Sequence, residues 1–403
     1  MYRSAVGLLA LLALAGVFGC TGEGAANPDV PAVVEGNTRF AFDLYGRLRE
    51  QDGNLFFSPY SISAALAMTS AGARGATADE MAKVLHLSLG TEKLAATEGA
   101  LARQINGEGR KRGYRLRTAN ALWGQKGFAF RPEFLKLTGD GYGAPLHEVN
   151  FAATEEARKA INAWVEKQTE EKIKDLIKQG VLNADTRLVL TNAIYFKGDW
   201  QSQFQKNLTR DEPFKLAGGK TVPVPLMHQQ ARFGYLDRPD FQMLEMPYSG
   251  KDLSMVVLLP KKTDGLAALE KELTADNLGR WLKGAREEKV QVALPRFRLT
   301  AEFELNKVLS ALGMPSAFTG SADLSGMGGN PGELYLSAVV HKAFVDVNEE
   351  GTEAAAATGA AVAERSAAPV EPVFRADHPF VFLIRDRQSG AVLFLGRLTS
   401  PTT

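Results

Sequence analysis

Residues 334–363 read LYLSAVVHKAFVDV followed by NEEGTEAAAATGAAVA. The first part is long and alternates in polarity, which predicts a β-strand. The second part almost lacks large side chains. By itself it fits a flexible alanine-rich linker or a short helix, because alanine has the highest helix propensity. The unusual feature is a strong strand that runs directly into a segment without bulk.

Helical patterns are concentrated in the first half of the chain. An apolar residue recurs every four positions from 40 to 48, and small apolar residues fill 61–70, as in a buried helix. A capping-box pattern at 77–80 and a polar start at 154–156 predict two further helices, the second of which runs to about Lys167.

Strand patterns dominate the second half. Runs rich in β-branched, leucine and aromatic residues occupy 187–196, 253–259, 290–294, 380–384 and 391–395. The last two flank RDRQSG, which predicts a hairpin turn. Helices early and strands late favour the α+β class over a regular βαβ repeat. No linker or internal repeat is visible after the N-terminus, so we expect a single domain over 33–403.

The N-terminus is separate from this domain. A single basic residue, an apolar run over 5–18 and a small residue before Cys20 predict a secretory signal peptide over 1–19. Residues 17–20, VFGC, resemble a bacterial lipobox, in which the cysteine is acylated; the alternative is an ordinary signal peptide with an incidental cysteine. We expect a lipidated Cys20 and a flexible tether over 20–32. The protein would then be exported and either anchored to the bacterial cell envelope or extracellular.

The composition argues against several classes of function. The chain has 47 Lys+Arg and 46 Asp+Glu, and removal of 1–19 takes away Arg3 and no acid, which leaves 46 of each sign (47 − 1 = 46). Nothing therefore indicates nucleic-acid binding. The five histidines lack metal-ligand spacing, and there is no G-x-S-x-G elbow or P-loop. We expect no metal, no cofactor and no enzymatic active site.

Several segments resemble motifs of the serpin (serine protease inhibitor) family, in the family's order. They are NLFFSPYSIS at 54–63, GARGATADEM at 72–81, TNAIYFKGDW at 191–200, DLSGM at 323–327, LSAVVHKA at 336–343 and DHPFVFLI at 377–384. One match would be weak evidence, but six in order across about 34–400 make chance negligible.

The resemblance implies a fold and a mechanism. The fold has three β-sheets, about nine helices and an exposed reactive-centre loop, here about 349–376. In the family this loop enters the main sheet after cleavage. The loop begins with a hinge, here Glu349, Glu350, Gly351, Thr352, Glu353, Ala354, Ala355 and Ala356.

The hinge sequence suits insertion between two strands. Alternate residues would face the core, and one set is small or moderate and uncharged: Thr352, Ala354, Ala356, Thr358, Ala360 and Val362. The opposite set contains Glu353, which must lie on the wetter face. A slip of one residue would bury Glu353 at a substantial desolvation cost, so the register is specified. Gly351 suits a hinge because glycine is conformationally permissive.

The scissile bond is assigned in two ways. The family's spacing from Glu349 places it between Arg365 and Ser366, and Arg365 is also the only basic residue between Lys342 and Arg375. An arginine suits a protease whose specificity pocket carries an aspartate. We therefore expect a covalent complex with a trypsin-like serine protease. An arginine-specific cysteine protease is an alternative, and an elastase-like protease that cleaves near residues 362–363 is a weaker one.

A polar cluster is also implied by the resemblance. Ser58, Ser61, Asn192 and His341 match residues that lie beneath the opening of the main sheet in the family, and Trp200 matches a residue near the entrance of the loop. The ordinary alternative is buried hydrogen bonding with no further role. These groups would bond in a closed sheet and must find new partners when it opens, so we expect them to control opening and not to catalyse.

Two other classes of function compete with inhibition. A non-inhibitory serpin, such as a carrier or chaperone, usually has a charged or bulky hinge residue at the positions that Thr352 and the alanines occupy here. A hydrolase lacks its catalytic constellation. We expect a monomer that contacts a membrane only through its lipid.

A basic cluster could attract a polyanion, although a solvated loop is the simpler interpretation. Its members are Arg110, Lys111, Arg112, Arg115 and Arg117.

Overall fold

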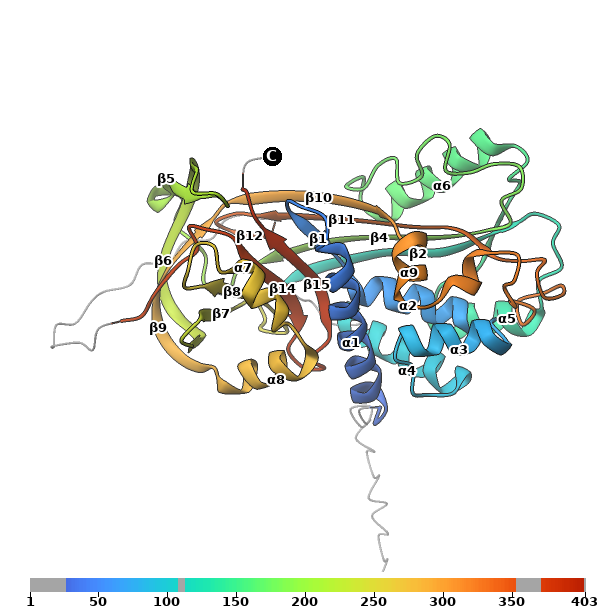
Figure 1. Cartoon of the computed structure of the whole chain (residues 1–403), viewed down its shortest axis with the longest axis horizontal. Coiled ribbons are helices and arrows are strands. Elements are labelled where there is room, and N and C mark those ends of the chain that lie inside the picture. The colour runs from blue at the N-terminus through green and yellow to red at the C-terminus, as the bar shows by residue number, and fades with distance from the viewer. Residues whose placement is uncertain (1–26, 108–112, 353–370, 402–403) are drawn as a thin grey trace, which may run out of the picture.

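The computed structural model describes residues 27–107, 113–352 and 371–401 (Figure 1). Several predicted features lie outside these ranges and are not described. They are the signal peptide over 1–19, Cys20, most of the tether, Arg110, Lys111, Arg112, the hinge from Glu353 to Ala356, and the reactive bond Arg365–Ser366.

The described residues form nine α-helices. Their bounds are α1 (Val30–Leu48), α2 (Pro59–Ser70), α3 (Gly75–Val84), α4 (Thr91–Asn106), α5 (Pro132–Lys136), α6 (Thr154–Gln168), α7 (Leu266–Lys271), α8 (Ala275–Gly284) and α9 (Asn306–Leu312). A π-helical turn η1 (Leu137–Gly141) and two 3₁₀ turns, η2 (Lys206–Leu208) and η3 (Pro315–Phe318), complete the set. None of the helices that the structure describes is long and apolar enough to cross a bilayer.

A six-stranded sheet runs along the molecule. In spatial order its strands are β10 (Phe297–Glu304), β11 (Leu336–Val347), β12 (Gly351–Thr352), β4 (Leu188–Asp199), β2 (Tyr114–Gln125) and β3 (His147–Val149). β11 also pairs directly with β4. The expected strands at 187–196 and 334–347 are therefore confirmed, and the structure shows that they are neighbours.

A second, nine-stranded sheet packs against one end of the first. It comprises β1 (Leu55–Phe57), β15 (Val392–Leu398), β14 (Phe380–Asp386), β8 (Leu253–Pro260), β7 (Phe241–Pro247), β6 (Thr221–Asp237), β9 (Arg286–Pro295), β13 (Val373–Arg375) and β5 (Arg210–Lys215). Its long strand β6 pairs with β5 near its start and with β7 near its end. The two smaller sheets of the expected three are thus continuous through β6.

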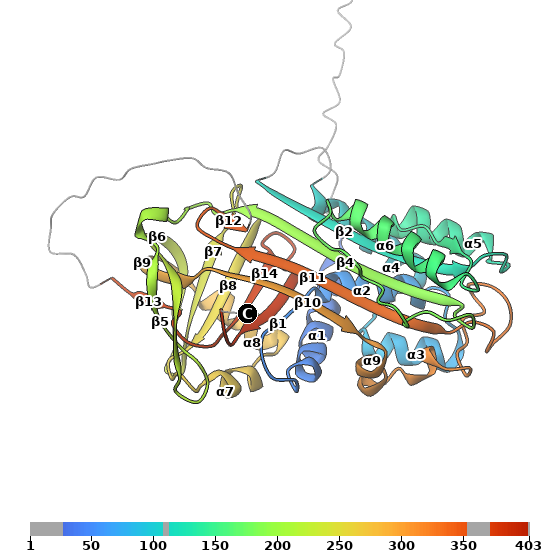
Figure 2. The same cartoon turned by 90° about the horizontal axis from the view of Figure 1, so that it is seen from above.

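Both faces of the six-stranded sheet are covered (Figures 1 and 2). On one face α6 packs through Ile161 and Val165 onto alanine and valine side chains of β2, β4 and β11. On the other face lie α1, α2 and the nine-stranded sheet, with Leu188 and Leu190 of β4 in their core. Burial on both sides explains why the strand sequences are nearly continuous apolar runs.

Two expectations about helix starts were wrong. The tether was expected to run to residue 32, but α1 begins at Val30, and Asp29 just before it pairs with Lys93 at 2.8 Å. The helix expected to be capped at Thr77 begins at Gly75. Thr77 is buried inside that helix, where its hydroxyl accepts a hydrogen bond from the amide of Asp323 at 2.9 Å. A tertiary contact therefore explains this threonine better than a cap does.

Candidate functional site: the seam between β4 and β11

The seam is the line along which the parallel strands β4 and β11 pair. Residues 188–195 of β4 lie beside residues 336–344 of β11. Beyond this stretch the strands diverge, and β12 lies between them. Its backbone pairs Thr352 with Val347 on one side and with Gly198 on the other. The seam is therefore already open at one end and holds the first residues of the hinge (Figure 2).

A tight turn reverses the chain from β11 into β12. The amide of Asn348 donates to the carbonyl of Gly351 at 2.9 Å, and the amide of Gly351 donates back to Asn348 at 3.3 Å. Residues 349–350 form the two-residue loop of this hairpin. Further growth of β12 would extend an existing antiparallel strand, so no new turn has to form.

Gly351 is required by this geometry. Its φ is +151°, and a Cβ atom built there would lie 2.1 Å from the carbonyl oxygen of Gly198. No side chain can occupy that space without moving β12 away from β4. Gly351 was expected to act as a hinge through its flexibility, and close backbone approach is the stronger reason for a glycine.

The segment 200–206, which follows β4, holds the turn from outside. The amides of Trp200 and Phe204 donate to the carbonyls of Glu350 and Glu349 at 2.9 and 2.8 Å. The indole Nε1 of Trp200 donates to the carbonyl of Asn348, also at 2.9 Å. Three hydrogen bonds from one short segment thus fix the position of the turn.

Two acidic residues of the turn are neutralised in different ways. Glu349 is buried, which by itself would oppose ionisation, but hydrogen bonds from Arg296 and Thr209 outweigh burial and lower the pKa of its carboxyl. Glu350 pairs with Lys206, whose side chain is exposed. The Glu349 contact is therefore the stronger anchor, because exposed ion pairs contribute little.

Four predicted residues meet in the middle of the seam. Asn192 of β4 and His341 of β11 are register partners, and His341 Nδ1 donates to Asn192 Oδ1 across the seam. Asn192 Nδ2 donates to Ser61 Oγ at 2.8 Å, and the backbone amide of Ser58 donates to His341 Nε2 at 3.1 Å. We call Ser58, Ser61, Asn192 and His341 the seam cluster, and all four are fully buried.

The seam cluster requires a neutral histidine. Because His341 Nε2 accepts from the Ser58 amide, the ring proton is on Nδ1. Burial disfavours the charged ring and lowers the pKa of His341 to about 3. Opening of the seam would break the contact between His341 and Asn192 and expose groups that must find new partners.

Trp200 does not belong to this cluster. It directly follows β4, eight residues after Asn192, at the open end of the seam, where its ring stacks on Tyr248 with centroids 4.6 Å apart. This is the entrance of the seam, near which the resemblance placed it.

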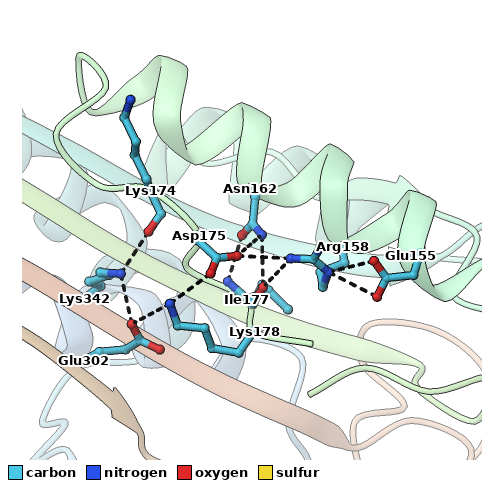
Figure 3. A network of polar contacts seen from close by, with 9 residues as sticks. All are labelled: Glu155, Arg158, Asn162, Lys174, Asp175, Ile177, Lys178, Glu302 and Lys342. Atoms are coloured by element: carbon cyan, nitrogen blue, oxygen red, sulfur yellow. Dashed lines mark hydrogen bonds and ion pairs between the residues drawn. The ribbon is translucent and has the colours of Figure 1, made fainter. Parts of the chain in front are cut away.

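A network of charged residues lies over the seam on the α6 side (Figure 3). Lys342 of β11 donates to the carbonyl of Lys174, in the segment between α6 and β4, and pairs with Glu302 of β10, both at 2.9 Å. In the same segment, Asp175 pairs with Arg158 of α6 at 3.1 Å. The network therefore ties α6 and its following segment to the β10–β11 side of the seam.

The basic cluster is partly compensated within the molecule. Arg117 Nε and Arg115 Nη1 lie 2.9 and 3.5 Å from the carboxylate of Glu170. Residues 110–112 lie outside the described ranges. Because two of the five cations already have an internal anion, the simpler interpretation of a solvated surface is favoured over a polyanion site.

Sequence reasoning missed two contributors to the seam. Asn120 of β2 accepts hydrogen bonds from both Ser61 and Asn192, at 2.9 and 2.6 Å. A polar residue between two alanines of a buried strand was a usable signal. Arg296, the partner of Glu349, gave no local signal, since 53 residues separate the pair.

Comparisons with known proteins match the chain nearly end to end. The family model "Serpin (serine protease inhibitor)" matches residues 35–401. The leukocyte elastase inhibitor of Bos taurus is 48% identical over 376 residues, which cover 91% of this chain and 98% of that protein. The structure of Serpin48 of Tenebrio molitor superposes with a TM-score of 0.82 at 34% identity, covering 93% and 99% of the two chains. Uncleaved ovalbumin gives a TM-score of 0.83 at 31% identity, covering 92% and 100%.

The first prediction concerns the position of β12 between β4 and β11. Gly351→Ala should expel β12 from the seam and lower native stability by roughly 1–3 kcal/mol, the range for a strained backbone position. Hydrogen exchange should show faster exchange of the Trp200 and Asn348 amides. Gly219→Ala is the matched control, because Gly219 also has a positive φ but no atom lies within 4 Å of a Cβ placed there. Unchanged protection in Gly351→Ala would contradict the seating.

The second prediction concerns acid sensitivity. The unfolded chain binds a proton at His341 near pH 6.5, whereas the native protein binds it only near pH 3. The stability that the native state gains by keeping His341 neutral is fully present above pH 6.5 and is lost as the pH falls. Between pH 7.5 and 5, the native protein should lose about 2 kcal/mol relative to His341→Gln. Urea unfolding measures the difference, with His86→Gln as control. Parallel profiles of the native protein and His341→Gln would refute the assignment.

Proposed function

The chain belongs to the serpin family, and we propose that it inhibits trypsin-like serine endopeptidases by trapping them as a covalent complex. The family description, serine protease inhibitor, and the names of the relatives are those of inhibitors and not of catalytic enzymes. The observation that carries the trapping mechanism is β12, whose backbone already lies between β11 and β4. The residues that follow it in sequence are small, which suits continued growth of this strand.

The proposed reaction begins as ordinary proteolysis. The protease serine Oγ attacks the carbonyl carbon of Arg365, and its proton passes through the protease histidine to the amine of Ser366 as the peptide bond breaks. The product is an ester between the protease and Arg365. Growth of β12 down the seam then carries the attached protease away before water can hydrolyse the ester.

The free energy of strand growth supports this order of events. A strand of a dozen residues adds on the order of twelve backbone hydrogen bonds, at a net contribution of about 1 kcal/mol each. The sum, roughly 10 kcal/mol, equals the stability of a typical domain. It is large enough to deform an attached protease.

Strand length supports Arg365 as the scissile residue. β4 and β11 each have 12 residues. The segment 352–365 is long enough to run the full length of the seam. Cleavage near residues 362–363 would give a shorter inserted strand. Relatives that are named leukocyte elastase inhibitor nevertheless make an elastase-like protease the second candidate. An arginine-specific cysteine protease is the third.

A non-inhibitory role is the alternative in a different class. A carrier or chaperone would not need a hinge that can enter the sheet. The seated turn at 348–351 and the uncharged alternate residues after it favour inhibition. A gel that shows an SDS-stable complex with trypsin would separate the two classes.

We also propose that the protein is exported and lipid-anchored through Cys20. The support is the apolar run over 5–18 and the VFGC boundary. The relatives named above are animal proteins and add nothing to the bacterial part of this proposal. A protein with an ordinary signal peptide would instead be released outside the cell.

The third prediction separates recognition from trapping. Arg365→Ala should leave the hinge able to insert but remove the side chain that trypsin recognises, so the complex should form at least tenfold more slowly. Because Thr352 already lies between β11 and β4, Thr352→Arg should leave recognition intact but unseat β12, so that growth of the strand would have to bury the charge at a cost of several kcal/mol. That variant should be cleaved after Arg365 and released. Mass spectrometry locates the cut, and a gel measures the trapped fraction. Trapping by Thr352→Arg at native stoichiometry would refute insertion.

The fourth prediction concerns the anchor. Cys20→Ser should abolish labelling by a fatty-acid probe and move the protein into the soluble fraction, because acyl chains provide the membrane affinity. The chain has a single cysteine, so no second thiol complicates the result. Equal labelling of Cys20→Ser and the native chain would rule out the lipid anchor.

A further inference from the structure

Glu98 is a carboxyl group in an unusual place. It lies on α4, is 3% exposed, and faces the junction of α4 with α1, α2 and η1. Its Oε1 accepts one long hydrogen bond, 3.5 Å, from Asn37 of α1. Its Oε2 is buried and has no hydrogen-bond partner among the described residues. A carboxylate in such a site is costly, and protonation relieves the cost.

The groups around Glu98 do not stabilise a negative charge. Tyr60 of α2 and Tyr142, next to η1, are the titratable side chains close enough for Glu98 to affect their ionisation, and both remain neutral. Asp386 acts on Tyr60 and adds a second negative charge to the region. No lysine or arginine in the described ranges forms a salt bridge with Glu98.

The backbones of α4 and η1 pack closely at this junction. A Cβ atom at Gly99 would lie 2.2 Å from the carbonyl oxygen of Gly141, and one at Gly141 would lie 2.8 Å from the Cβ of Ala95. α4 and η1 therefore touch through their main chains beside Glu98.

Two hydrogen bonds link Glu98 to α2, the helix that carries Ser61 of the seam cluster. Asn37, which donates to Glu98, accepts a hydrogen bond from the hydroxyl of Ser63 at 2.6 Å. Ser63 lies on α2, two residues after Ser61, whose hydroxyl accepts from Asn192. The same short helix is thus linked to the Glu98 carboxyl through Asn37 and contacts the seam directly through Ser61.

We propose that Glu98 is a proton-controlled contact: in its neutral form it keeps α2 firmly packed beneath the seam, and its ionisation loosens α2 and eases opening of the sheet. The effect on opening rests on the proposed insertion mechanism. The effect on stability does not.

The direction of the pH effect follows from burial. Burial raises the pKa of Glu98 from 4.5 to about 7, against a small opposing effect of the Asn37 hydrogen bond. The native protein therefore binds a proton that the unfolded chain releases between pH 4.5 and 7. The contribution of Glu98 to the free energy of unfolding is highest below pH 4.5 and falls as the pH rises. Between pH 5.5 and 8.5 the unfolding equilibrium constant should rise about 30-fold through this group alone.

Urea unfolding of the full chain tests the stability effect. Glu98→Gln should remove this 30-fold dependence, whereas Glu92→Gln, an exposed position on the same helix, should keep it. The slope with pH is the readout, because the new amide adds an unpaired donor whose cost does not vary with pH. If Glu98→Gln follows the same pH profile as the native protein, the proposal is wrong. If Glu98→Gln does not fold, the test is hydrogen exchange of the α4 amides in the native protein. The exchange rates are corrected for the intrinsic pH dependence of exchange. Opening free energies that do not change with pH would then overturn the proposal.

Uptake of a synthetic peptide tests the effect on the seam. The probe is TEAAAATGAAVA, the sequence of residues 352–363. Its rate of uptake should rise several-fold from pH 5.5 to 8.5 in the native protein and in Glu92→Gln, but not in Glu98→Gln. Equal pH dependence in all three would overturn the link to the seam. Absence of uptake at every pH, together with a normal stability result, would instead count against the insertion mechanism.

Discussion

The hydrogen bond between His341 and Asn192 spans the seam, and the surrounding structure depends on it. β4 and β11 are buried on both faces, so their side chains are shielded from solvent when the strands are paired. The seam cluster makes pairing conditional on polar contacts that are satisfied only when the strands are adjacent. Each buried polar group that loses its partner costs about 1–3 kcal/mol. The closed sheet is therefore held by a barrier at its middle while its open end already holds β12.

In this arrangement, the start of strand insertion and its completion depend on different parts of the seam. At the open end, the turn at 348–351 is fixed by segment 200–206 and by the buried contact between Glu349 and Arg296. Strand growth from that turn is downhill once residues enter, but it must pass the seam cluster and the network around Lys342. Two buried titratable groups act on this barrier in opposite directions. His341 favours the native state at higher pH, and Glu98 favours it at lower pH, so their effects offset one another between about pH 4.5 and 6.5.

Local sequence signals predicted the elements well. The alternation at 334–347 and the apolar run at 187–196 predicted β11 and β4, but nothing in the sequence predicted that these two strands are neighbours. The polar residues of the seam cluster were identified through the resemblance to the serpin family and not from a local pattern. What could not be predicted depends on contacts between distant residues. Arg296 and Asn120 lie far in sequence from the groups that they bond, and Gly351 is fixed by the carbonyl of Gly198. Glu98 looked like any helical glutamate, because only packing shows that it is buried.

The separation of β4 from β11 after cleavage is the most direct test of the seam as the site of insertion. The two strands are now hydrogen-bonded neighbours, with Asn192 beside His341. Adjacent strands lie about 4.8 Å apart, so insertion of one strand between them should double that spacing to roughly 10 Å. A crystal structure of the chain cleaved after Arg365 would measure the distance between the Cα atoms of Asn192 and His341. We predict the doubled separation, with residues 352–363 between them; an unchanged spacing, with the two side chains still bonded, would contradict the account.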